Sequence, residues 1–193
     1  AASVAPQNPC LGVMLPYTPL HHLLMQQLAF PVVATSGNLS DEPICIANQE
    51  ALQRLAAIAD FFLIHDRPIA RQMDDSVVQV VDGELMILRH ARGFAPTSLS
   101  LPGLSQPLLA LGVHLKNSVA VGQSGNAVLG QHIGDLDTEQ AVSAFVRESN
   151  SLQHLHEISP ESVIADKHPD YYSSIHAESL GLPYLELADV GVD

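Results

Sequence analysis

Short polar segments that follow apolar runs carry the residue types best suited to hold a phosphorylated ligand. The first is Thr35-Ser36-Gly37-Asn38, at the end of the apolar run 30–35. A strand that ends in small hydroxyl residues and a glycine exposes backbone N–H groups and short side-chain donors together, which suits phosphate or carboxylate oxygens. An ordinary strand-to-helix turn has the same composition, so the pattern alone leaves both interpretations open.

A second polar segment contains the adjacent residues Asp74 and Asp75, just before an expected strand. Consecutive residues on a strand point to opposite faces, so these carboxylates are not expected to form an acid–base pair on one ligand. Five of the eight Lys and Arg residues fall between Arg54 and Arg92. Such a concentration of cations suits a small anion, although salt bridges to neighbouring aspartates would explain it equally well.

The second half of the chain contains three further polar segments, each after an expected strand: GVHLKN (112–117), QHIGDL (131–136) and DKHPDY (166–171). A glycine turn that carries Lys116 and Asn117 is the kind of loop that binds nucleotide phosphates, and it is also a common hairpin end. Asp166 and His168 suit a polar site better than a complete metal ligand set, because neither H-x-x-x-H nor C-x-x-C occurs.

Composition and charge argue against several functions. The formal net charge of −13 argues against nucleic-acid binding, which requires a basic face. No apolar run reaches bilayer length and no basic segment with an apolar stretch opens the sequence, so we expect a soluble, cytoplasmic protein without a membrane partner. Cys10 and Cys45 are too few for a disulfide framework and lack metal-ligand spacing.

The elements that would position the polar segments follow from apolar periodicity and turn residues. In the first half we expect helices at 20–28 and Asn48–Asp60, strands at Phe30–Thr35 and Phe61–His65, and a hairpin of Ser76–Val81 and Glu84–Arg89 around Asp82-Gly83. In the second half we expect strands at Leu108–Val113, Ser118–Gly122, Ala127–Gly130 and Ser162–Ala165, and helices at Thr138–Leu155 and Tyr171–Leu180. Between the halves, Gly93–Pro107 is rich in Pro, Gly and Ser, which predicts a linker. The pattern predicts an α/β or α+β chain in two lobes.

Eight motifs occur in a fixed order along the chain: LPYTPLHHLL (15–24), TSGNLSDEP (35–43), IADFFLIHDRPI (58–69), DDSVV (74–78), LRHARGFAP (88–96), LGVHLKNS (111–118), GQHIGDLDT (130–138) and ADKHPDYYSS (165–174). In this order and spacing they resemble the HypF family of hydrogenase maturation carbamoyltransferases. The resemblance runs from about Leu11 to Pro183, nearly the whole chain.

The resemblance implies a division of the chain into three parts. Residues 1–95 would be the C-terminal part of a YrdC-like domain with a partial, twisted mixed sheet, and 96–107 a linker. Residues 108–193 would open a TsaD-like domain with the fold of the actin-like (ASKHA) ATPases. In such proteins an acylphosphatase domain and a zinc-binding region come first, and a histidine-rich metal motif follows, so we expect an incomplete fragment whose parent's zinc or iron ligands lie elsewhere.

The resemblance also implies the chemistry. HypF proteins use carbamoyl phosphate and ATP, with Mg²⁺, to make a carbamoyl adenylate. They then pass the carbamoyl group to the C-terminal cysteine of a HypE-type maturation protein, where it becomes the cyanide ligand of [NiFe] hydrogenase. Adenylation depends mainly on positioning and electrostatics, so no protein nucleophile is required.

Carried onto this sequence, the family motifs give two sets of candidate residues. The candidate catalytic residues are Lys116, His132 and Asp135. The candidate residues for binding nucleotide and carbamoyl adenylate are Thr35, Ser36, Gly37, Asn38, Arg67, Asp75, Ser76, Arg89, Asn117, Asp166 and His168.

Two other functions stay open at this point. An enzyme of tRNA threonylcarbamoyladenosine synthesis would use the same domain types, but the acidic charge and the joining of both types in one chain disfavour it. A non-catalytic module that docks a partner protein would show no ATP-dependent change in melting temperature, which distinguishes it from an enzyme.

Overall fold

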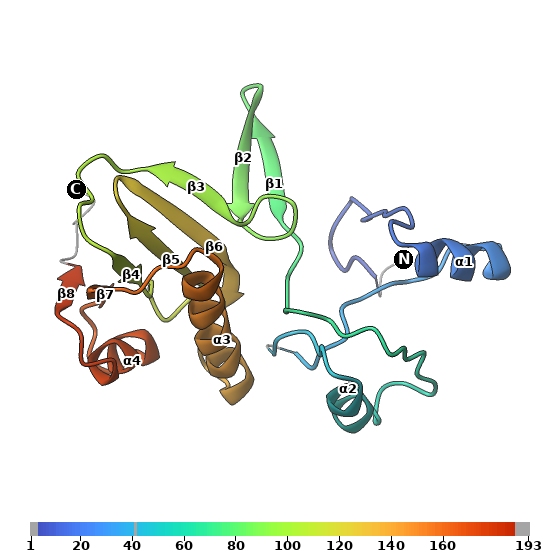
Figure 1. Cartoon of the computed structure of the whole chain (residues 1–193). Coiled ribbons are helices and arrows are strands. Elements are labelled where there is room, and N and C mark those ends of the chain that lie inside the picture. The colour runs from blue at the N-terminus through green and yellow to red at the C-terminus, as the bar shows by residue number, and fades with distance from the viewer. Residues whose placement is uncertain (1–3, 41, 188–193) are drawn as a thin grey trace. The chain divides into compact units, whose positions relative to one another are not determined.

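Residues 4–40 and 42–187 are described by the structure, a computed structural model in which the chain forms two units, Ala1–Ser36 and Gly37–Asp193. Figure 1 gives the element labels used below. In the first unit, α1 (Pro19–Leu28) begins where the Thr18 hydroxyl accepts a hydrogen bond from the backbone N–H of His21. It ends at Ala29, whose φ of 57° is left-handed. The helix expected at 20–28 is therefore confirmed, with a hydroxyl cap and a proline at its start, as helix N-termini favour.

The strand expected at Phe30–Thr35 is wrong. These residues pair with no other described segment, and Phe30 and Val33 remain exposed. A strand is held by hydrogen bonds to a neighbour, so β-branched composition alone does not produce one.

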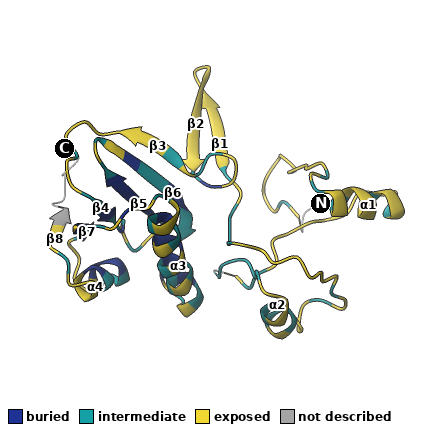
Figure 2. Ribbon diagram, viewed as in Figure 1, coloured by how far each residue is buried: buried dark blue, intermediate teal, exposed yellow. Residues whose placement is uncertain are grey.

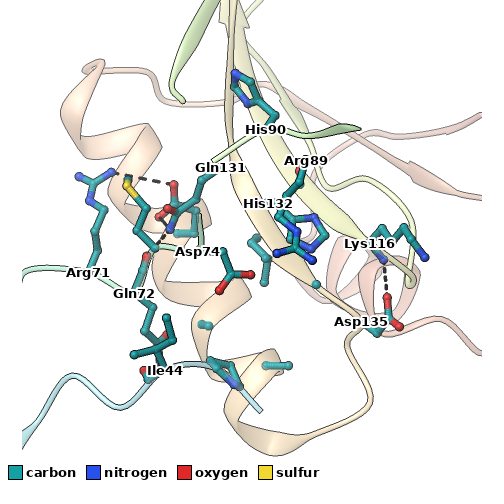
Figure 3. Close-up of a pocket in the computed structure, with 18 of the residues that line it drawn as sticks. Ile44, Arg71, Gln72, Asp74, Arg89, His90, Lys116, Gln131, His132 and Asp135 are labelled. Carbon is teal, nitrogen blue, oxygen red and sulfur yellow. Dashed lines mark hydrogen bonds and ion pairs between the residues drawn. The ribbon is translucent and has the colours of Figure 1, made fainter. Parts of the chain in front are cut away.

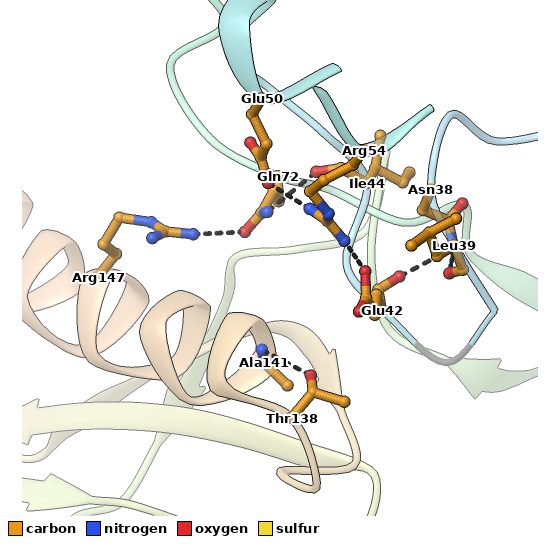
Figure 4. Close-up of polar contacts among 10 residues, drawn as sticks. All are labelled: Asn38, Leu39, Glu42, Ile44, Glu50, Arg54, Gln72, Thr138, Ala141 and Arg147. Atoms are coloured by element: carbon orange, nitrogen blue, oxygen red, sulfur yellow. Dashed lines mark hydrogen bonds and ion pairs between the residues drawn. The ribbon is translucent and has the colours of Figure 1, made fainter. Parts of the chain in front are cut away.

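The second unit opens with loops and one short helix. Helix α2 (Asn48–Arg54) is confirmed at its start but ends well before the expected Asp60. Its N-cap is Ala47 rather than Asn48, because the Asn48 side chain donates to the carbonyl of His65 instead (2.9 Å). Arg54 bridges Glu42 and Glu50 and so ties the helix to the preceding loop (Figure 4).

Residues 61–65 form no strand, contrary to expectation, and Phe61 is 92% exposed. The hairpin is confirmed: β1 (Val77–Val81) pairs antiparallel with β2 (Glu84–Arg89) around Asp82 and Gly83. Both turn residues have positive φ, 52° and 84°, which matches the right-handed twist of the strands. Every residue of the two strands is exposed, as Figure 2 shows.

A six-stranded sheet forms the rest of the second unit, in the order β3-β6-β5-β4-β7-β8. Strands β3 to β6 are antiparallel neighbours, whereas β7 and β8 run parallel to β4. The strands are β3 (Thr97–Ser100), β4 (Leu108–Ala110), β5 (Asn117–Gln123), β6 (Asn126–Gly134), β7 (Ser162–Asp166) and β8 (Tyr184–Leu187). The three consecutive strands expected between 108 and 130 are confirmed, and they pair as the antiparallel meander β4, β5 and β6. Strands β3 and β8 were not expected, and β3 lies within the segment interpreted as a linker.

Two helices cover the sheet and complete the core. Helix α3 (Glu139–Leu155) packs on β5 and β6, and α4 (Tyr172–Ser179) on β7. Phe145 is fully buried between them, with ring contacts to Tyr172 and His176. Both helices are confirmed, and Leu155, the last residue of α3, is 57% exposed. Among the described residues, no helix has the length and apolarity needed to cross a membrane.

Candidate functional site

A pocket of about 800 Å³ lies within the second unit. It is lined from one side by the chain between Asn38 and His90, and from the other by β5, β6 and α3 (Figure 3). Its charged residues include Asp74, Arg89 and Lys116. The pocket is therefore a polar site built from segments far apart in the sequence.

The end of β2 is held against β6 by hydrogen bonds around His90. The His90 carbonyl accepts from the backbone N–H of His132 (2.7 Å), and the His90 ring nitrogens contact the carbonyl of Gly130 (3.2 Å) and the hydroxyl of Thr97 (2.7 Å). Because Arg89 directly precedes His90, these bonds place its guanidinium at the pocket, beside His132.

The electrostatic environment of His132 favours its neutral form. Its pKa is lowered, first by burial and next by the Arg89 guanidinium; Asp74 and Asp135 oppose the shift, and Lys116 adds to it. A neutral imidazole between two cations and two carboxylates can accept a proton or a hydrogen bond at physiological pH.

The loop that carries Lys116 is rigidly held. Gly112 has a φ of 62°, and a Cβ there would lie 2.5 Å from the backbone oxygen of Ser118, so only glycine fits. The fully buried Asn117 amide donates to the carbonyls of Leu111 (2.8 Å) and Val113 (2.5 Å). The backbone N–H of Lys116 donates to a carboxylate oxygen of Asp135 (2.6 Å). The exposed ammonium group is thus presented from a fixed backbone.

A polar network around the buried residues Gln131 and Glu148 lines the other end of the pocket. Glu148, on α3, is 6% exposed and accepts a hydrogen bond from Gln131 on β6 (3.3 Å). Arg71 lies 4.0 Å from its carboxylate. Gln72 accepts from Gln131 through its backbone carbonyl (2.6 Å) and from Arg147 through its side chain (2.8 Å) (Figures 3 and 4). The network ties the loop at 71–72 to α3 and β6.

Replacing Glu148 with glutamine should stabilise the chain at neutral pH. Burial raises the pKa of Glu148, an effect that Arg71 and the bonds from Gln131 oppose. The folded chain therefore holds this proton more tightly than the unfolded chain does, and the resulting stability is complete below pH 4.5 and lost as the pH rises through the folded-state pKa. Glu148→Gln removes this titration, so we expect a higher free energy of unfolding than that of the parent at pH 7 in chemical denaturation, and no difference near pH 4.5.

The matched control is Glu161→Gln, which makes the same change at an exposed position and should leave the pH dependence of the parent chain intact. A Glu148→Gln variant that is less stable than the parent at pH 7 would mean that the ion pair with Arg71 outweighs the cost of burial.

Two family models match this chain, one on each side of residues 92–103, and residues from both matched regions line the pocket. Residues 1–91 match the family described as "Telomere recombination" (Sua5/YciO/YrdC), and residues 104–190 match the HypF Kae1-like domain. The carbamoyltransferases HypF of Synechocystis sp. and Rhodobacter capsulatus are 51% and 43% identical to it, over 94% and 95% of this chain. The chain belongs to the HypF family.

Solved HypF structures share the fold. A full-length HypF, crystallised in its phosphate- and nucleotide-bound form, aligns with 92% of this chain at a TM-score of 0.83 and 43% identity. HypF of T. kodakarensis aligns with 96% of it, also at a TM-score of 0.83, with 32% identity. The chain spans about a quarter of these relatives: 24% and 25% of the two carbamoyltransferases, and 28% and 25% of the two crystallised chains.

The structure of this HypF-family chain brings together part of the predicted site. The predicted residues that line the pocket are Asn38, Arg89, Lys116, His132 and Asp135. The Asn38 side-chain amide donates to the carbonyls of Leu39 and Glu42 (2.9 Å each), so it also fixes its own turn (Figure 4). Thr35 and Ser36 belong to the first unit, and Gly37 opens the second.

Other predicted residues make structural contacts away from the pocket lining. The Ser76 hydroxyl accepts from Ala91 N–H (3.0 Å) and donates to the Arg92 carbonyl (2.9 Å), which closes the base of the hairpin. Asp75 lies 3.4 Å from the Arg92 guanidinium at an exposed position. The remaining predicted residues outside the lining are Arg67, in an exposed loop, the buried Asn117, and Asp166 and His168 at the end of β7.

Sequence reasoning missed the polar network at Arg71, Gln72, Gln131, Arg147 and Glu148. One signal for it was present: Glu148 and Ser149 lie between Phe145 and Leu152 at helical spacing, on the buried stripe of α3. A carboxylate on an apolar stripe requires a buried partner, and this marks a candidate polar site.

Proposed function

We propose that this chain is the part of a HypF-type carbamoyltransferase that binds ATP and carbamoyl adenylate between its YrdC-like and Kae1-like regions. The reaction would be ATP-dependent activation of carbamoyl phosphate to carbamoyl adenylate, followed by transfer of the carbamoyl group to the C-terminal cysteine of a HypE-type protein. The process served would be the maturation of [NiFe] hydrogenase. The parts assigned from sequence, 1–95, 96–107 and 108–193, remain our proposal for the domain limits.

One observation carries this proposal: both family-matched regions supply charged residues to the same pocket. Asp74 and Arg89 come from the first region, and Lys116 and Asp135 from the second. A pocket of about 800 Å³ is in the size range of nucleotide sites.

The charges in the pocket suit a nucleotide and its metal. Arg89 and Lys116 are the cations for phosphate oxygens. Asp74 and Asp135 fit Mg²⁺, which binds through one or two carboxylates together with the phosphates of its nucleotide. The neutral His132 would accept a hydrogen bond or proton from the carbamoyl-bearing group. The relative crystallised with phosphate and nucleotide supports this assignment.

Binding of ATP should depend on Lys116. We expect calorimetric titration of this chain with ATP and Mg²⁺ to show saturable binding. Lys116→Ala should lower the affinity for ATP at least tenfold, since a charged hydrogen bond to phosphate contributes about 1.5–3 kcal/mol. Adding carbamoyl phosphate tests for the second substrate.

The matched control is Lys167→Ala, which removes the same charge outside the pocket lining and should bind ATP as the parent does. Absence of binding in a parent sample shown to be folded would overturn the proposal for this chain, because the site would then require residues outside it. Equal loss in both lysine variants would indicate non-specific attraction of the anion.

A further inference from the structure

The loop 112–117 meets two other segments at its tip. The first is the turn after β6, which carries Asp135 and Asp137, and the second is the start of α4, at Tyr171 and Tyr172. The side chain of His114 contacts both segments, and Figure 3 shows the neighbouring bond from Lys116 to Asp135. Three segments that are separate in the sequence therefore converge on one imidazole.

Each ring nitrogen of His114 has its own partner. Nδ1 lies 3.3 Å from the backbone N–H of Tyr172, which can only donate, so Nδ1 is the acceptor. The other nitrogen, Nε2, then carries the proton and donates to the Asp137 carboxylate at 3.0 Å. The backbone of His114 is held as well, because its carbonyl accepts from Leu136 N–H (3.0 Å). The ring is fixed in one tautomer and one orientation.

An aromatic stack supports the flat face of this ring. Tyr171 stacks on His114 with ring centroids 5.2 Å apart, and His168 stacks on Tyr171 at 4.3 Å. The backbone N–H of His168 donates to the Asp166 carboxylate (2.8 Å). The DKHPDY segment, whose polar residues do not line the pocket, thus ends in a stack directed at the loop of Lys116.

We infer that His114 is a positioning residue for the phosphate-binding lysine. By joining Asp137 to the start of α4, it holds the 112–117 loop against the 135–137 turn and so keeps the Lys116 backbone on Asp135. The DKHPDY segment acts through the Tyr171 stack as the support of this arrangement rather than as a ligand. The expected effect of His114 on ATP binding rests on the proposed function. Its expected effect on the position of the 112–117 loop does not.

A series of replacements separates the contacts of His114. In His114→Ala all three contacts are lost. In His114→Gln the terminal amide can still reach Asp137, in His114→Asn the carbonyl can still accept from Tyr172, and in His114→Phe the stack alone remains. The control is His154→Ala, which removes an exposed imidazole from α3.

Two readouts are taken on each variant of the full chain. Hydrogen exchange of the Lys116 amide, measured by NMR, reports the bond to Asp135 without any nucleotide. Titration with ATP and Mg²⁺ reports the site. We expect His114→Ala to lose about tenfold in both protection and affinity, with recovery in His114→Gln and no change in His154→Ala.

The two proposals fail in different ways. Unchanged protection of the Lys116 amide in a folded His114→Ala variant would overturn the positioning role whatever ATP does. Absence of ATP binding to the parent chain would overturn the proposed function, while the exchange measurement would still decide the role of His114. Equal losses in His114→Ala and His114→Gln, with full recovery in His114→Phe, would assign the effect to stacking and exclude the bond to Asp137.

Discussion

Replacing Phe145 with alanine should cost the second unit about 3–5 kcal/mol of unfolding free energy. The side chain is fully buried in the core between α3 and the sheet, and its ring contacts Tyr172 and His176 on α4 (centroids 5.9 and 5.4 Å apart). Truncation removes a large apolar surface from the core and leaves a cavity that the surrounding sheet can only partly fill.

Urea unfolding followed by circular dichroism measures this loss, since the chain contains no tryptophan for fluorescence. Leu155→Ala is the matched control because it shortens an apolar side chain of the same helix that is 57% exposed, and it should cost well under about 1 kcal/mol. A Phe145→Ala variant that unfolds at the same urea concentration as the control would mean that α3 does not anchor the core.

The substitution Asn117→Asp should destabilise the chain by about 3 kcal/mol at pH 7, even though the two side chains have nearly the same shape. The Asn117 amide is fully buried and donates to two backbone carbonyls, those of Leu111 and Val113. An ionised carboxylate has no proton to donate and would face both oxygens as an unpaired charge.

The loss should shrink at low pH, because a protonated carboxyl can donate to one of the two carbonyls. The control is Asn126→Asp, the same change at the exposed first residue of β6, which should alter the unfolding free energy by less than about 0.5 kcal/mol. Thermal melts of both variants at pH 4 and pH 7 make the comparison. If Asn117→Asp melts like the control at pH 7, the amide bonds do not hold the Lys116 loop.

Local signals predicted the β1–β2 hairpin and most of the second half of the chain, because these elements carry their own turn and cap residues. Asp82-Gly83 predicts a hairpin turn, and Thr138 predicts the start of α3, which its hydroxyl caps by accepting from Ala141 N–H at 3.1 Å (Figure 4). The strands β4 to β6 follow one another in the chain and pair with their neighbours, so short-range pattern is enough to find them.

The errors arise where structure depends on distant residues. Phe30–Thr35 and Phe61–His65 have strand composition, but neither finds a partner strand among the described residues. Strand β3 was hidden in a segment of linker composition, and it exists because β6 is long enough to pair with it along Leu129 to Asn126. Pairing partners cannot be read from a single segment, because strand propensity reflects the surface on which a strand packs.

The site was predicted in part for a related reason. Lys116, His132 and Asp135 fall in short motifs next to strands, and strand ends place them at the pocket. The network around Glu148 depends instead on a buried face of α3 meeting a loop nearly eighty residues earlier, at Arg71. The spacing of residues within either segment does not predict the contact between Arg71 and Glu148.

The order of strands in the six-stranded sheet sets a sequence of events during synthesis. Strands β3 to β6 lie between Thr97 and Gly134, so the ribosome can release a complete antiparallel half-sheet before α3 has formed. In this half-sheet β4 is an edge strand, and it stays unpaired on that edge until its parallel partner β7 (Ser162–Asp166) has been synthesised. During that interval Leu109, almost fully buried in the finished fold, lies on an unpaired edge. Nascent chains stalled between α3 and β7 should therefore be the most prone to aggregate or recruit chaperones.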